Sequence, residues 1–149
     1  MGSITVVTAL LGYAARDEAC GVLMAAAKHL PDLVVMAGGL PQLALTLLLL
    51  EESRQRAVVA FLHELKAFHA AGITRARFVG PLLHLAGDVL DDAAYLRAVC
   101  EVVAAVTKVD ASLTAHALEN DTCKAVQARL LAHEDELVSA AAKMVQDLL

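Results

Sequence analysis

The chain has 149 residues, enough for one domain with a substantial core; 58% of them are apolar, but only 3% are aromatic. Its net charge of −5 at pH 7 argues against a general nucleic-acid surface, because neutralising phosphates takes clustered lysines and arginines. The three cysteines, Cys20, Cys100 and Cys123, are widely spaced and form no CxxC pair. This usage fits reduced thiols in the cytoplasm or nucleus better than a disulfide framework.

The first third of the chain predicts short apolar helices separated by turn residues. ITVVTALLGY at 4–13 and GVLMAAAKHL at 21–30 each predict a helix. Residues 33–50 carry no charge over 18 positions, which is the lower limit for a membrane-spanning helix. Gly38, Gly39 and Pro41 interrupt this segment, so we expect two helices meeting at a Gly-Gly-Leu-Pro turn and no membrane insertion.

The rest of the chain predicts alternating middle and long helices with acidic or capping residues at their starts, where the helix dipole favours negative charge. A long helix is expected from Ser53, a corner at Ala71-Gly72 and a middle helix at 78–87. The remaining expected features are a long helix after Asp91-Asp92, a cap at Asp110, a corner at Asn120-Asp121, a middle helix at 124–133 and a terminal helix starting near Glu134.

Three alanine-rich helices recur at nearly constant spacing. Ala57, Ala98 and Ala140 occupy equivalent positions, with offsets of 98 − 57 = 41 and 140 − 98 = 42 residues. A looser copy is centred on Val22, 57 − 22 = 35 residues upstream. Periods of about 40 to 47 residues are typical of armadillo and HEAT solenoids, whose repeats bury their apolar faces only against neighbouring repeats.

One segment carries a more specific resemblance. VVMAGGLPQLALTLLLL at 34–50 resembles the NxxxxxxGGLPxLxxLL run of armadillo repeats, and AAGITRARFVGPLLHL at 70–85 is a looser match. The resemblance implies one all-α domain over 1–149, a right-handed α-solenoid of about three and a half armadillo/HEAT-like repeats. It also implies about ten helices, with the long helices lining a concave face that binds protein partners.

The chain departs from the nuclear-import adaptors of this family, whose long helices carry a Trp and, four residues later, an Asn. No such ladder is present here, in the preferred register or in one shifted by a residue, so binding of basic localisation peptides is not expected. On armadillo alignment the groove-facing residues expected to contact a partner are Lys28, Arg56, Val59, His63, Arg97, Cys100 and Gln146. Among these, Arg56, His63 and Arg97 carry long polar side chains suited to binding backbone carbonyls.

The sequence shows no constellation of catalytic or metal-ligating residues. HExxH, GxSxG, glycine-rich phosphate loops and Cys-His clusters are absent, and six histidines are scattered, so no metal, cofactor or enzymatic activity is expected. His84 is expected to be satisfied by a neighbouring carbonyl.

Three functions remain as hypotheses: a protein interaction module, a self-associating scaffold, and a small helical-bundle enzyme or sensor. The regular spacing of 41 and 42 residues disfavours the third, since a bundle has no reason to keep it. Neither end of the chain shows the polar cap that a solenoid needs. We therefore expect a homo-oligomer or a fragment of a longer armadillo protein.

Overall fold

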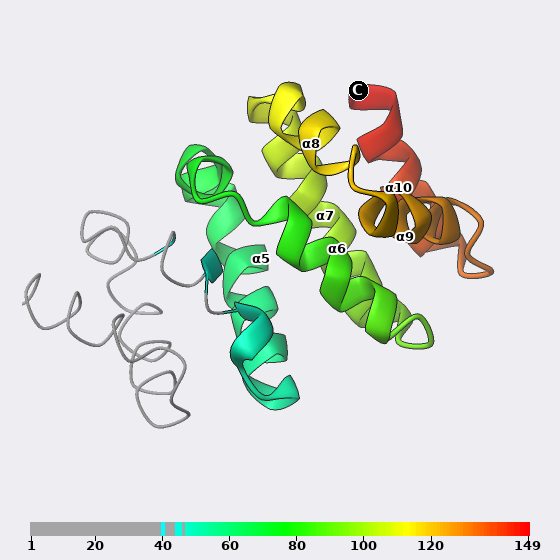
Figure 1. Ribbon diagram of the computed structural model, residues 1–149, viewed down its shortest axis with the longest axis horizontal. Helices are drawn as coiled ribbons and strands as arrows, with labels where there is room; N and C mark the ends of the chain where they lie inside the picture. Colours follow the sequence, from blue (N-terminus) through cyan, green and yellow to red (C-terminus); the bar gives the residue numbers. More distant parts are fainter. Residues whose placement is uncertain (1–39, 41–43, 46) are drawn as a thin grey trace, which may run out of the picture.

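A computed structural model of the protein describes residues 40, 44–45 and 47–149, and all regular structure in this part of the chain is helical (Figure 1). The elements between residues 47 and 149 are η1 (Leu47–Leu49), α5 (Glu52–Arg75), α6 (Val79–Asp88), α7 (Ala93–Val109), α8 (Ala111–Ala117), α9 (Asp121–Leu131) and α10 (Glu136–Leu148). No strand occurs among these residues, which confirms the predicted all-α class for the described part.

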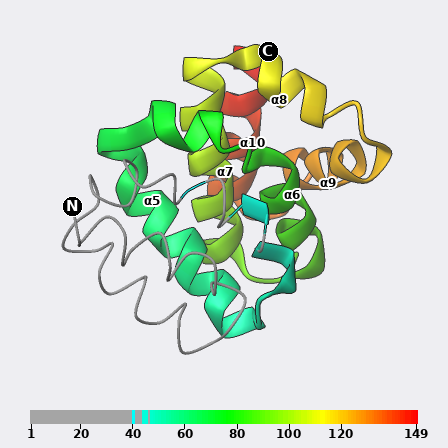
Figure 2. The same cartoon turned by 60° about the vertical axis from the view of Figure 1, so that its left-hand side comes forward.

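The helices form two layers. The three long helices α5, α7 and α10 lie side by side, with α7 packed between the other two (Figures 1 and 2). Helices α6 and α9 pack against each other and cover α7 and α10, while the short α8 packs on α7 and α6. The long helices run in the same direction, their C-terminal ends together at the top of Figure 1. This arrangement presents one broad face made only of long helices.

Side-chain caps determine where four of the helices begin. Each capping oxygen accepts backbone N–H groups of the first turn, which have no partner within the helix. The caps are Asp92 for α7, Asp110 for α8, Asn120 for α9 and Asp135 for α10. Asp92, Asp110 and Asp135 lie at or beside the starts expected from the sequence. Asn120 was expected as a corner residue, and α9 begins directly after it, before the predicted start at 124.

The end of α5 differs from the prediction. A corner was expected at Ala71-Gly72, but the helix continues through Gly72 to Arg75. One glycine inside a helix costs only about 1 kcal/mol relative to alanine, so it does not end a helix whose flanking turns are packed. The chain reverses at Arg77 instead, which has a positive φ of 62°. The corner therefore lies five residues later than expected from Gly72.

Aliphatic side chains from all these helices form one continuous core. Each described helix except α8 contributes fully buried aliphatic residues, and the largest fully buried side chains between 61 and 130 are Leu62, Ile73, Phe78, Leu82, Leu83, Leu96 and Leu130. Only Phe78 among them is aromatic, as expected from a composition in which leucine, valine and alanine fill the core. Close helix packing relies here on small residues such as Ala104 and Ala142, both nearly inaccessible.

His133 connects two loops across the layers. Its Nδ1 accepts a hydrogen bond from the backbone N–H of Asp135 at 3.0 Å, so its Nε2 carries the proton and donates to the carbonyl of Leu90 at 2.8 Å. These bonds join the loop before α10 to the loop before α7. The carbonyl contact that we expected for His84 is thus made by a different histidine, whereas the His84 imidazole has no hydrogen-bonding partner among the described residues.

Candidate interaction surface

A charged bridge joins the N-terminal parts of α5 and α7. The Nη1 of Arg56 donates to Oδ2 of Asp92 at 2.6 Å, and the same guanidinium also contacts Glu52, one turn earlier on α5. The guanidinium carbon lies 4.8 Å from the ring centroid of Tyr95, within the range of a cation–π contact. Arg56 is thus held by α7 on two sides while 38% of its side chain stays exposed.

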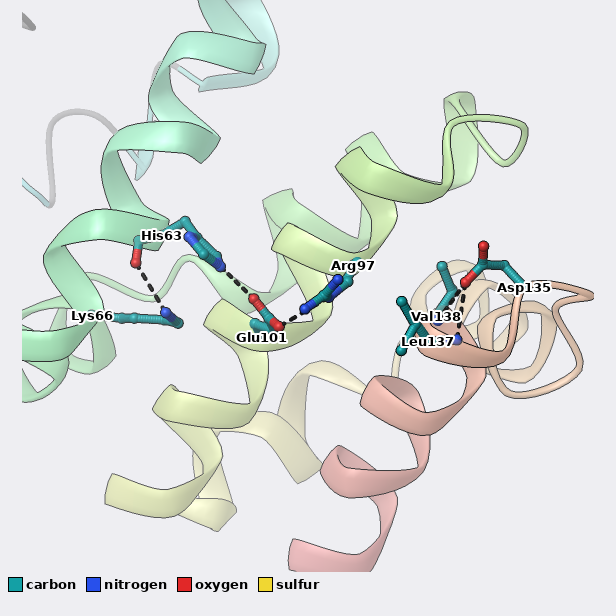
Figure 3. A network of polar contacts seen from close by, with 7 residues as sticks. All are labelled: His63, Lys66, Arg97, Glu101, Asp135, Leu137 and Val138. Atoms are coloured by element: carbon teal, nitrogen blue, oxygen red, sulfur yellow. Dashed lines mark hydrogen bonds and ion pairs between the residues drawn. The ribbon is translucent and has the colours of Figure 1, made fainter.

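A second bridge joins the same two helices about two turns further along (Figure 3). His63 on α5 makes a hydrogen bond with Glu101 on α7, and Arg97 donates from Nε to the other carboxylate oxygen of Glu101 at 3.3 Å. On α5, Lys66 donates to the carbonyl of His63 at 3.1 Å. The side chains of His63, Glu101 and Arg97 remain 36%, 32% and 50% exposed. We call the six residues of the two bridges the charged face: Glu52, Arg56, His63, Asp92, Arg97 and Glu101.

The charged face shifts the ionisation of its own carboxyl groups. The hydrogen bond from Arg56 lowers the pKa of Asp92, and a further bond from the backbone N–H of Tyr95 lowers it again. The hydrogen bond with His63 lowers the pKa of Glu101, with Arg97 adding to the effect. Asp92 in turn raises the pKa of Arg56. Both carboxyl groups are therefore held in the ionised form more strongly than usual, which keeps the face electrostatically mixed.

Val59 and Cys100 lie within the same helix–helix contact but are buried. They were expected to face a groove, whereas the structure leaves them only 1% and 2% exposed. The reason is that α5 and α7 pack directly against each other, so residues between the two bridges become core. Burial raises the pKa of the Cys100 thiol to about 12, which keeps it protonated at neutral pH. Neither side chain is available to contact a partner.

Gln146 and Lys28 are the other two residues expected to contact a partner. Gln146 is exposed near the end of α10, in the same layer of long helices. Lys28 lies outside the described residues. Of the seven expected contacts, the structure thus brings Arg56, His63 and Arg97 together on one exposed surface, whereas Gln146 lies on α10, which contributes no residue to the charged face.

Asp92 and Glu101 complete this surface and were not among the expected contacts. Asp92 was recognised only as a helix-start residue. Glu101 follows Arg97 by four residues, the spacing at which helical side chains pair, so a search for such pairs would have found half of its role. Its contact with His63 depends on how α5 and α7 are aligned, which no local pattern reveals.

Other kinds of site were sought in the described part of the chain. No group of three or more His, Cys, Asp or Glu residues there could hold a metal ion. None of the described helices combines the length and apolar character needed to cross a membrane. Comparisons with protein-family models, with curated proteins and with solved structures gave no match.

Proposed function

We propose that the chain is a non-enzymatic protein interaction module, an armadillo-type α-solenoid that binds an extended or helical segment of a partner protein across α5, α7 and α10. Support for the solenoid comes from the layered packing of long and middle helices together with the sequence period of 41 and 42 residues. Free Cys100 and Cys123 suit a reducing compartment and support a cytoplasmic or nuclear location.

The observation that carries the proposal is the charged face. It holds both signs of charge on neighbouring helices, and its side chains are fixed by mutual contacts yet between 32% and 69% exposed. Arg97 uses its Nε for Glu101, and the terminal nitrogens of its half-exposed guanidinium remain able to donate to a partner's carbonyls or carboxylates. Pre-ordered donors lower the entropy cost of binding an extended segment.

The test is a comparison of proteins retained by the immobilised chain and by a variant of its charged face. Arg56→Ala, His63→Ala and Arg97→Ala together should abolish retention of the partner, because they remove the basic half of both bridges. His116→Ala, Lys124→Ala and Arg129→Ala likewise remove one histidine and two cationic side chains, on α8 and α9, and should leave retention unchanged. Equal loss with both variants, or none with either, would refute the assignment. Circular dichroism confirms that each variant is folded.

A second candidate, a self-associating scaffold, is favoured by a different observation. Leu137 and Met144 of α10 are 58% and 48% exposed, and their spacing of seven residues places them on one side of the helix. Large apolar side chains exposed on one side of a helix can form part of a protein contact. Light scattering at micromolar concentration should then show a species larger than 15.7 kDa that reverts to that mass with Leu137→Glu and Met144→Glu. A 15.7 kDa wild-type species without concentration dependence would rule the scaffold out.

A further inference from the structure

A cleft of about 650 Å³ lies between α6 and α9 and reaches Leu48 of η1 and Gln55 of α5. Its size falls in the range of small-molecule sites, about 300 to 1,000 Å³. Leu48, Leu85, Gly87, Ala125 and Val126 form its apolar part. Its polar lining consists of Gln55, His84, Asp88, Asp121, Thr122 and Arg129. None of the residues of the charged face lines this cleft.

Four ionisable side chains that line the cleft have no bonding partner among the described residues. The side chains of His84, Asp88, Asp121 and Arg129 form no hydrogen bond or ion pair there. The charged face shows the opposite behaviour, since each of its ionisable side chains is paired with another. Groups of both signs that face one cavity without pairing are available to a ligand that carries complementary charges.

The packing of α6 on α9 brings two of these charges to the same end of the cleft. A Cβ placed on Gly87 would lie only 2.9 Å from Cγ2 of Val126, so the two helices approach closely there. Asp88 follows Gly87 directly, and Arg129 lies one turn beyond Val126 on the same side of α9. A carboxylate and a guanidinium therefore flank this end of the cleft without forming an ion pair.

The position of Asp88 at the end of α6 makes this end of the cleft selective for a positively charged ligand group. Asp88 is the last residue of α6, where the unpaired carbonyl groups already create negative potential, and no basic residue occupies that turn. This environment favours an ammonium group beside Asp88. The planar guanidinium of Arg129 can bind a carboxylate through two parallel hydrogen bonds. One end of the cleft thus suits an ammonium and a carboxylate held close together.

We propose that the cleft binds a free α-amino acid, with its ammonium on Asp88 and its carboxylate on Arg129. Asp121 and Thr122 lie at the start of α9, eight residues and about 12 Å along the helix from Arg129. The ligand's side chain extends towards them past His84. Because Asp121 is a second unpaired carboxylate, a basic side chain fits best, and L-arginine is the probe of choice. This binding does not depend on the proposed partner face.

The test is a titration of the isotope-labelled chain followed by backbone amide NMR. L-Arginine should shift the resonances of Gly87, Asp88, Thr122 and Ala125. Agmatine lacks the carboxylate and N-acetyl-L-arginine lacks the ammonium, and each should bind at least about tenfold more weakly, as loss of a charge-assisted hydrogen bond implies. Agmatine binding as tightly as L-arginine would overturn the proposal, since it would show only general attraction of a cation.

Matched variants separate the site from the overall charge. Asp88→Asn and Arg129→Gln should each weaken L-arginine binding by about tenfold or more. Asp91→Asn and Lys124→Gln make the same changes of charge at exposed positions outside the cleft and should leave the affinity unaltered. Equal weakening by the control variants, or no resonance shift with L-arginine at about 10 mM, would contradict the assignment.

Discussion

Arg56 and Asp92 are 36 residues apart in the sequence but form a 2.6 Å ion pair between α5 and α7. The Asp92 carboxylate has a second task, because its other oxygen accepts the backbone N–H of Tyr95 and caps α7. A single side chain therefore caps the start of α7 and connects this helix to α5. The position of the charged face depends on this residue.

Substitutions at Asp92 should separate its role as the cap of α7 from its role in the ion pair with Arg56. Asparagine can still cap a helix but cannot form the ion pair, whereas alanine does neither. We expect Asp92→Ala to lower the melting temperature more than Asp92→Asn, and Asp91→Asn, outside the bridge, to have no effect. Thermal unfolding followed by circular dichroism measures the order. Equal melting temperatures for the alanine and asparagine variants would show that the cap contributes nothing.

The second bridge predicts a pH dependence at Glu101. Its pKa is lowered in the folded state by His63 and Arg97. A carboxyl group with a lowered folded pKa contributes stability that is present above its unfolded pKa, about 4.3, and is lost as pH falls through the folded value. Since these side chains are about one-third to one-half exposed, solvent screening limits the contribution to about 0.2 to 1 kcal/mol.

Denaturant unfolding of the wild type and of Glu101→Gln measures this contribution. At pH 7 the variant should be less stable, and the difference should shrink towards zero as the pH is lowered below about 4. A difference that stays constant between pH 7 and pH 3 would mean that the charge of Glu101 is not involved.

The close contact of α6 and α9 predicts the effect of Gly87→Ala. The added methyl group would meet Val126 at 2.9 Å, and overpacking of this kind costs about 1 to 3 kcal/mol. Replacing glycine in a helix recovers at most about 1 kcal/mol, so a net loss of unfolding free energy is expected. Val126→Ala removes the opposing methyl group, and in that background Gly87→Ala should no longer destabilise. Additivity of the two changes within about 0.5 kcal/mol would contradict the contact.

His133 predicts a loss of stability on substitution. His133→Ala removes the hydrogen bonds to Leu90 and from Asp135, each worth about 0.5 to 1.5 kcal/mol. Urea unfolding should show a lower midpoint, whereas His116→Ala, at an exposed position on α8, should leave it unchanged. Equal midpoints for wild type and His133→Ala would show that the loop connection does not stabilise the fold.

Local signals explain which features could be predicted. The starts of α7, α8, α9 and α10 follow from Asp92, Asp110, Asn120 and Asp135, because a capping side chain acts on the turn that follows it. The end of α5 could not be read in this way. Gly72 resembles a corner residue, but packing on both sides keeps it helical, and the turn occurs at Arg77.

The candidate surface was only partly predictable for a related reason. The alignment with armadillo repeats assigned Arg56, His63 and Arg97 to a groove-facing surface, and the structure leaves them exposed. The same alignment assigned Val59 and Cys100 to that groove, although the direct contact of α5 with α7 buries them. Two properties depend on how α5 and α7, about 40 residues apart in sequence, are aligned. One is which carboxylates pair with the basic residues, and the other is whether residues such as Val59 line a groove or lie in the core.

The most direct test of the proposed interaction surface is a backbone amide NMR map of the chain with and without the partner segment recovered by the retention experiment. The account predicts that shifts concentrate on α5, α7 and α10 around Arg56, His63 and Arg97, and that Arg56→Ala, His63→Ala and Arg97→Ala together abolish them. Shifts confined to α6, α8 and α9, or a segment that still binds this variant with wild-type affinity, would contradict it.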